Sequence, residues 1–308
     1  MPEVVAPWTS PLSETEHALV LFGLATAGRA LLAMLVRTCI VRHEVSGRYR
    51  PAIAASLGLL AVAALSYAVI VVKFDAGYTL QGDAWVPNQQ AVWAWSARYM
   101  DWAVTVPLLM IELIAVSSLR GATVARVRFV AVIAAFLMIA TGYIGAVAID
   151  GGESFGALLT WGVISSLFFA LIYVLVLFTV LRSLPALPSA ARPSYRGAMI
   201  LLMVTWFAYP AVVGLQGLTS GGAWVTAGQL LLCAADVIAK VGFGVLIHRV
   251  AKLRTAFDVE AGLDTHPETL WVDGARVSDA LYPPSADAVE PMPVRSERTD
   301  RDAAVVER

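Results

Sequence analysis

Apolar residues fill seven long stretches of the chain, and short polar links separate them. The stretches cover residues 18–37, 51–72, 92–117, 127–149, 155–181, 197–218 and 224–248. About 20 apolar residues in a helix cross the roughly 30 Å hydrocarbon core of a bilayer. The stretches lack the alternation of apolar and polar residues that is typical of strands in a membrane β-barrel. A segment that crosses the bilayer without strand partners can satisfy its backbone hydrogen bonds only as a helix. The pattern predicts an all-α fold, a seven-transmembrane helix bundle.

Composition agrees with this class. The chain has 308 residues, of which 58% are hydrophobic and only 15% charged, and its mean hydropathy is +0.72. These values indicate a multi-pass membrane protein rather than a soluble domain. A net charge of -1 and a pI near 6.4 give no general attraction to nucleic acid. The two cysteines, Cys39 and Cys233, belong to different apolar segments, so we expect neither a disulfide framework nor a cysteine metal site.

The charges of the links predict an orientation in the cell membrane. Basic residues gather in the first, third and fifth links: Arg37, Arg42, Arg48, Arg50, Arg120, Arg126, Arg128, Arg182, Arg192 and Arg196. Short loops rich in arginine face the cytoplasm. The other links hold mostly acidic residues or none. We therefore expect an extracellular N-terminus, a cytoplasmic C-terminus and a location in the plasma membrane.

Three regions follow from these patterns. Residues 1–16 form an extracellular segment, in which no basic region precedes an apolar core, so no cleavable signal peptide is expected. Residues 17–250 form the transmembrane domain. Residues 251–308 turn to Asp, Glu, Pro, Ser and Ala without a sustained apolar period, which predicts a disordered cytoplasmic tail.

Apart from Arg37, Arg128 and His248 at their ends, the seven stretches contain six acidic or basic residues: Arg29, Arg98, Asp101, Glu112, Asp236 and Lys240. Ionisable groups in a membrane are costly, and each is a candidate functional residue. In the third helix, a spacing of about 100° per residue puts Arg98, Asp101, Thr105 and Glu112 on one stripe. Because each residue rises about 1.5 Å, Asp101 and Glu112 are separated by roughly 16 Å along the axis. The stripe is a candidate ladder of proton-exchanging groups.

Asp236 and Lys240 are four residues apart, so they share one face of the seventh helix. They could form a structural ion pair that locks two helices. A buried lysine is also the type of amine that forms a Schiff base with a carbonyl compound. The resulting cation would need counter-charge, which Asp236 and Asp101 could supply.

Three motifs resemble one family. ARYMDWAVTVPLLMIE (97–112), WFAYP (206–210) and DVIAKVGFG (236–244) resemble the third, sixth and seventh helices of microbial rhodopsins, in the proton-pumping branch that includes bacteriorhodopsin and proteorhodopsin. The motifs occur in the family's order and spacing, and the resemblance covers about residues 17–250. It implies all-trans retinal as a cofactor and a photoreceptor or transporter rather than an enzyme.

The resemblance also assigns a role to each charged residue. Lys240 resembles the lysine that binds retinal as a Schiff base, Asp101 resembles the proton acceptor and counterion, and Asp236 resembles the second counterion. Arg98 resembles the extracellular gate. Thr105 resembles the hydroxyl bonded to the acceptor carboxylate, and Glu112 resembles the proton donor.

The expected retinal pocket follows the same pattern. Its residues are Trp102, Leu109, Met138, Gly142, Trp161, Ser165, Phe168, Trp206, Tyr209 and Pro210. Leu109 resembles the apolar choice at the family's colour-tuning position. Trp161 is bulky where carotenoid-binding relatives have glycine, which argues against a carotenoid antenna.

Two features depart from the family pattern. Pumps of the proteorhodopsin type place a histidine on the second helix against the acceptor, but here Ser66 or Tyr67 takes that approximate place. Arg29 has no counterpart in the pattern. It could snorkel toward the membrane surface or face a neighbouring protomer. Alternatively, it could reach toward Glu112 and favour the ionised donor.

These observations favour a light-driven outward proton pump, forming by resemblance a homo-oligomer of three or five copies. The alternative is a slow photosensor that signals to a cytoplasmic partner through the tail. Chloride pumping is disfavoured because Asp101 would repel chloride, and sodium pumping because the Asn and Gln pattern of sodium pumps is absent. A receptor or transporter without retinal would have to explain Lys240 by packing alone.

Overall fold

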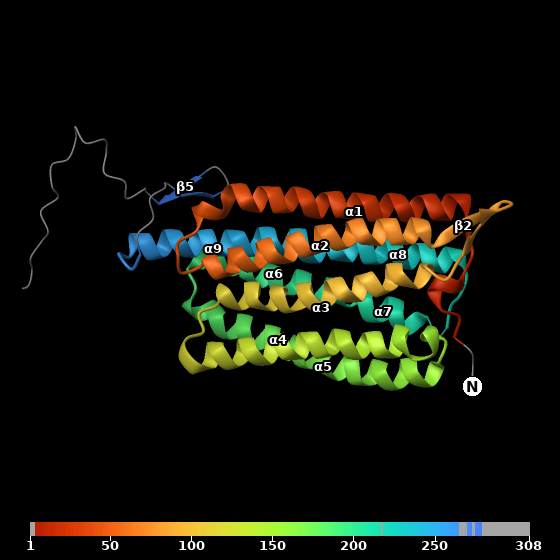
Figure 1. Ribbon diagram of the computed structural model, residues 1–308. Coiled ribbons are helices and arrows are strands. Elements are labelled where there is room, and N and C mark those ends of the chain that lie inside the picture. The colour runs from red at the N-terminus through yellow and green to blue at the C-terminus, as the bar shows by residue number, and fades with distance from the viewer. Residues whose placement is uncertain (1–3, 217, 265–269, 273–274, 279–308) are drawn as a thin grey trace, which may run out of the picture.

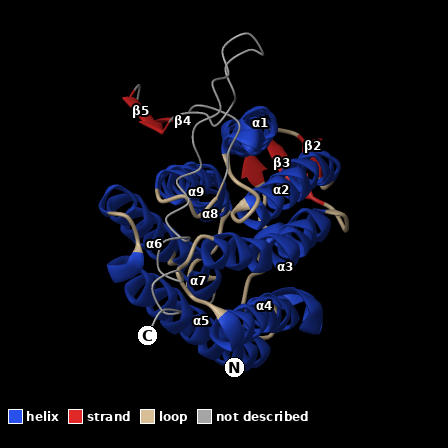
Figure 2. Ribbon diagram, turned by 90° about the vertical axis from the view of Figure 1, so that its left-hand side faces the viewer, coloured by secondary structure: helices blue, strands red, loops and turns tan. Residues whose placement is uncertain are grey.

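The protein is a bundle of long helical rods that lie side by side along one direction (Figure 1), and Figure 2 shows the bundle viewed along that direction. The structure is a computed structural model, and it describes residues 4–216, 218–264, 270–272 and 275–278. In these residues the rods are α1 (Glu14–Val41), α2 (Arg50–Ala76), α3 (Ala91–Ala115), α4 (Gly121–Tyr143), α5 (Phe155–Ser183), α6 (Arg192–Trp206) with α7 (Ala208–Leu215), and α8 (Gly222–Val237) with α9 (Phe243–Glu260). The prediction of a seven-helix bundle is confirmed, and most rods extend beyond their predicted ends.

Local sequence explains where several rods begin. Ser13 and Glu16 form a capping box at the start of α1: the Ser13 Oγ accepts from the Glu16 amide at 3.3 Å, and the Glu16 carboxylate accepts from the Ser13 amide at 2.8 Å. At the start of α5, the Ser154 Oγ accepts from the Ala157 amide. These side chains satisfy amides that the first turn of a helix leaves free.

The last two rods are not continuous α-helices. The sixth breaks between α6 and α7, where Pro210 lacks an amide hydrogen and its ring is incompatible with an unbroken bond to the carbonyl of Trp206. The seventh changes to a π-helical segment at Ile238–Gly242, between α8 and α9, and Lys240 is its central residue. Such insertions occur frequently at functional sites.

The two ends of the bundle are closed differently. We call the end that holds the start of α1 the N-terminal end, and the opposite end the C-terminal end. A three-stranded antiparallel sheet covers the N-terminal end, with β1 (Leu12–Ser13) beside β3 (Ala84–Pro87) and β3 beside β2 (Tyr78–Gln81). Gly82 makes the turn between β2 and β3 at φ 61°, a backbone angle that favours glycine.

The last helix extends past residue 250, the predicted end of the transmembrane domain, because α9 continues to Glu260. Arg254 explains the extension: it is buried, and its guanidinium donates to the carbonyls of Val116 and Ser117 at 2.7 and 2.8 Å. Two short strands, β4 (Leu270–Val272) and β5 (Ala275–Ser278), pair farther on. The rest of the predicted disordered tail, residues 265–269, 273–274 and 279–308, lies outside the described residues.

Polarity is distributed as expected for a membrane bundle. Large apolar side chains face outward along the rods, among them Phe22, Leu65, Phe129 and Leu167 at 68–71% exposure. Among the described residues, six rods are long and apolar enough to cross a membrane, and the other, α3, carries three buried charged residues, Arg98, Asp101 and Glu112. Arg29 is exposed on the outer face of α1, which agrees with the snorkelling or protomer-facing interpretation and contradicts a contact with Glu112.

Candidate functional site

Four charged side chains meet in the middle of the bundle. The Lys240 Nζ lies 2.6 Å from an Asp101 oxygen and 3.1 Å from an Asp236 oxygen. The Arg98 guanidinium lies 3.7 Å from the other Asp236 oxygen. All four residues are at least 98% buried. Two cations therefore balance two carboxylates in an apolar interior, where an unpaired charge would be strongly destabilising.

The two carboxylates differ in their hydrogen bonding. One oxygen of Asp236 accepts from Lys240, from the Tyr209 hydroxyl at 2.8 Å and from the Trp102 indole at 3.2 Å, and the other accepts from the Tyr67 hydroxyl at 2.7 Å. Asp101 accepts from Lys240 alone, and its second oxygen has no hydrogen-bond partner in the described residues. Asp236 is held as a carboxylate from several sides, whereas Asp101 has a free oxygen.

Arg98 is fixed by partners on two other rods. Its Nε and Nη2 donate to the Gln229 side-chain oxygen at 3.1 and 2.7 Å, and its Nη1 donates to the Tyr67 hydroxyl at 3.2 Å. Gln229 and Tyr67 are 1% and 0% exposed. Gln229 was not predicted from the sequence. It lies one turn before Cys233 and two turns before Asp236 in an apolar stretch, and a buried polar residue of this kind requires a partner.

One expected hydrogen bond is different in the structure. The Thr105 hydroxyl donates to the backbone carbonyl of Asp101 at 2.9 Å, not to the Asp101 carboxylate. The reason is that the carboxylate turns toward Lys240, while a threonine in a helix readily bonds the carbonyl four residues back. On the second rod, Tyr67 rather than Ser66 reaches the cluster, and it contacts Asp236 instead of the expected acceptor.

Glu112 stands apart from the cluster, three turns farther along α3 toward the C-terminal end. It is 1% exposed, and its Oε2 has no hydrogen-bond partner among the described residues. Gly244 and Ser56 lie beside it: a Cβ built at Gly244 would be in ordinary contact, 3.8 Å from the other Glu112 oxygen and 3.6 Å from the Ser56 hydroxyl. The ionised form of Glu112 would lack a cation close by, so this apolar site favours the neutral acid.

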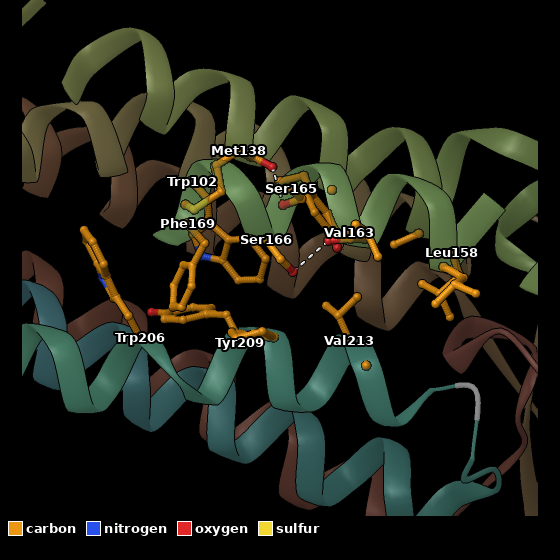
Figure 3. A pocket seen from close by; sticks show the side chains of 18 of the residues that line it. Trp102, Met138, Leu158, Val163, Ser165, Ser166, Phe169, Trp206, Tyr209 and Val213 are labelled. Atoms are coloured by element: carbon orange, nitrogen blue, oxygen red, sulfur yellow. Dashed lines mark hydrogen bonds between the residues drawn. The ribbon is translucent and has the colours of Figure 1, made fainter. Parts of the chain in front are cut away.

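A cavity of about 460 Å³ lies next to the charged cluster, between α3, α4, α5 and the sixth rod. Figure 3 shows Trp206 and Tyr209 toward one end of it and Leu158 and Val213 toward the other. Trp102 and Tyr209 line the cavity and both donate to Asp236. The cavity is apolar, has a size typical of a small-molecule site, and ends at the residues that surround the lysine.

Seven of the ten predicted pocket residues line this cavity: Trp102, Met138, Gly142, Ser165, Trp206, Tyr209 and Pro210. Leu109 and Phe168 pack in the core without lining it. Sequence reasoning missed several lining residues, including Tyr99 and Phe169, because aromatic residues in apolar helices carry no signal that separates pocket from packing.

The prediction for Trp161 is wrong. Trp161 packs against Gly145, where a built Cβ would meet the Trp161 Cβ at 2.5 Å, and it does not line the cavity. Its neighbour Gly162 lines the cavity instead, and nothing lies within 4 Å of a Cβ built there. Successive residues of a helix are about 100° apart around its axis, so Trp161 and Gly162 lie on different faces of α5. The bulky side chain of Trp161 therefore does not block the cavity wall at Gly162.

Comparisons with known proteins agree with this geometry. Residues 14–253 match the family described as bacteriorhodopsin-like protein. Bacteriorhodopsin-I of Haloarcula marismortui is 31% identical over 233 residues, which covers 73% of this chain and 87% of that protein. Two solved structures are similar: thermophilic rhodopsin, with a TM-score of 0.72, and xanthorhodopsin, with a TM-score of 0.70. Each is 28% identical in sequence, and each match covers 82% of this chain and 99% of the other chain. Xanthorhodopsin is described as a light-driven ion pump with dual chromophore.

The fold and the site define a retinal-binding membrane protein with seven helices. The chain belongs to the bacteriorhodopsin-like family of microbial rhodopsins. Its class is that of light-driven ion pumps and photoreceptors, not enzymes, and retinal bound to a lysine as a Schiff base is its cofactor. The sequence holds three lysines, and only Lys240 lies in the charged cluster beside the cavity.

Replacing this lysine should remove the pigment. In Lys240→Ala, no amine is left beside the cavity, so added retinal should give no stable visible absorption band, while far-ultraviolet circular dichroism should still report a helical bundle. Lys252→Ala is the matched control, because Lys252 pairs with Glu44 away from the cluster, and it should keep its colour. A coloured Lys240→Ala protein that resists bleaching would contradict the assignment.

Proposed function

We propose that this chain is a light-driven proton pump that carries protons from its C-terminal end to its N-terminal end. With the arginine-rich links in the cytoplasm, this direction is outward. The observation that carries the proposal is the pair of unlike carboxyl sites on α3. Asp101 contacts the lysine and keeps one oxygen free, whereas Glu112 is buried farther along the helix, beside the Ser56 hydroxyl and with no ion-pair partner among the described residues.

When bound, retinal supplies light absorption and a Schiff-base proton that can leave the Lys240 nitrogen. The chain's residues decide where that proton goes. Asp101 is the acceptor because its oxygen is 2.6 Å from that nitrogen and it has only this one donor. Asp236 stays ionised, because Tyr67, Tyr209 and Trp102 donate to it in addition to the cation.

Glu112 is the proton donor in this scheme. Helical rise separates it from Asp101 by roughly 16 Å, so it serves the nitrogen from the opposite side. A neutral buried carboxylic acid keeps its proton and can donate it later as a general acid. Arg98, held by Gln229 on the N-terminal side of Asp101, provides the positive charge past which the proton leaves.

A slow photosensor with the same cofactor is the alternative function. A sensor does not need a buried proton donor for rapid turnover, so the burial of Glu112 favours the pump. In the described residues α9 continues beyond the bundle core to Glu260 and is anchored there by Arg254. This anchoring supports a fixed helix end more than a moving signalling element.

The pump is tested with oriented vesicles under illumination. We expect acidification on the side of the N-terminal end, which a protonophore abolishes. Asp101→Asn should stop transport, and Glu112→Gln should slow proton uptake by about 10²-fold, the usual size of a lost general acid. Glu153→Gln, which changes an exposed carboxylate in the link before α5, should pump normally.

Two results would contradict this scheme. The first is a light-induced pH change that a protonophore leaves unaltered. The second is a Glu112→Gln variant that cycles as fast as the parent protein.

The wall of the cavity at Gly162 supports a second proposal, a carotenoid antenna. The lining residues beside Gly162 include Leu159 and Val163, which are 57% and 53% exposed, so the cavity reaches the lipid-facing surface of α5. A long apolar pigment lying there could contact the retinal pocket directly, and a Cβ at Gly162 would face open space. Xanthorhodopsin, which is similar to this chain, is described as having a dual chromophore, and this supports a second pigment here.

Gly162→Trp should close this wall. With a carotenoid added, the parent's transport should respond to light absorbed by the carotenoid, and the variant's response at those wavelengths should fall to that of carotenoid-free protein. Gly156→Trp, at a helix position that does not line the cavity, is the control and should keep the response. Equal carotenoid-driven responses in the parent and in Gly162→Trp would contradict the proposal.

A further inference from the structure

A second cavity, of about 190 Å³, lies at the C-terminal end of the bundle, remote from the retinal pocket. It is formed where α2 and α4 begin and where α3 ends. Three arginines line it, Arg48, Arg120 and Arg128, and its remaining lining residues include no acid. The volume is that of roughly six water molecules at about 30 Å³ each, so it fits a compact polar group.

The cavity carries excess positive charge. Arg48 lies 3.2 Å from Asp258, which also accepts from the Tyr49 hydroxyl at 2.6 Å. Burial raises the pKa of Tyr49 to about 12, so this hydroxyl remains a neutral donor at ordinary pH. Arg120 and Arg128 are exposed, and within the described part of the chain neither has an ion-pair partner. The charge of Arg48 is thus balanced by a carboxylate, whereas the charges of Arg120 and Arg128 are not.

Backbone dipoles add to this charge. Both α2 and α4 begin at the cavity, and neither has a side chain that caps its first turn. The free amides at a helix N-terminus attract anions. The C-terminus of α3 also lies at the cavity, and the negative end of its dipole would repel an anion. Arg254 compensates this negative end, because it donates to the carbonyls of Val116 and Ser117.

Ser117 supplies an independent indication of a ligand. It lines the cavity and is 8% exposed, and its buried Oγ has no hydrogen-bond partner among the described residues. A buried hydroxyl without a partner is uncommon in a folded protein and requires an explanation. An acceptor oxygen of a bound anion would satisfy it.

We propose that this cavity binds a phosphate group, held by Arg120, Arg128 and the Ser117 hydroxyl. A phosphate carries more than one negative charge and enough acceptor oxygens to engage two guanidinium groups and a hydroxyl together. The group could belong to an anionic lipid at the membrane surface or to free phosphate, because both present the same oxygens. The site does not depend on the direction of proton transport.

The test uses the full chain with retinal bound, so that the visible band reports folding in every variant. Calorimetric titration with inorganic phosphate and native mass spectrometry from phosphatidylglycerol-containing micelles are run side by side. Arg120→Gln/Arg128→Gln should weaken phosphate binding or lipid retention at least tenfold, and Ser117→Ala should weaken it severalfold. The control is Arg126→Gln. Arg126 is exposed on the same helix but does not line the cavity, so this variant should bind like the parent.

The two arms separate the sources. Phosphate titration without lipid retention supports a free anion, lipid retention without phosphate titration supports a lipid headgroup, and both together support a site open to either. Absence of both in the parent would overturn the proposal. So would equal losses in Arg126→Gln and in the double variant, because the binding would then be a general property of the basic surface.

Discussion

The structure depends on the pairing of Lys240 with two carboxylates inside an apolar bundle. Moving a single charge from water into such an interior is unfavourable by several kcal/mol even after relaxation. Here Lys240 and Arg98 balance Asp101 and Asp236, and each of the four is almost completely buried. The cluster is therefore tolerated only as a unit, and the helices that carry its members must meet at one level of the bundle.

Several local features of the backbone position the side chains of this cluster and of the cavity beside it. The π-helical segment Ile238–Gly242 holds the lysine, and the break before Pro210 places Trp206 and Tyr209 at the cavity. Tyr209 then joins the two parts of the site, because it lines the cavity and donates to Asp236. The unequal hydrogen bonding of the two aspartates gives them different chemistry although they contact the same amine.

The same geometry gives the site a direction. Arg98 lies on the N-terminal side of Asp101, and Glu112 lies on the C-terminal side along one helix. The residues proposed as proton acceptor and donor therefore lie at different levels of α3. The second cavity, with Arg120 and Arg128, belongs to the C-terminal surface and shares no residue with this path.

Sequence patterns predicted the bundle well because length and apolarity decide whether a helix can span a membrane. They also identified the charged residues of the cluster, since ionisable groups are conspicuous in apolar stretches. Finer geometry was not predictable in the same way. Tyr67 and Gln229 look like ordinary polar residues until their partners are known, and the difference between Trp161 and Gly162 depends on helix rotation. The length of α9 depended on tertiary contacts of Arg254.

In the proposed mechanism Asp101, and not Asp236, receives the proton. Light-induced infrared difference spectroscopy tests it directly, because a protonated carboxyl group has a carbonyl stretch that a carboxylate lacks. We predict a positive carbonyl band on illumination that shifts in Asp101→Glu and stays in place in Asp236→Glu. A band that shifts only in Asp236→Glu would contradict the account.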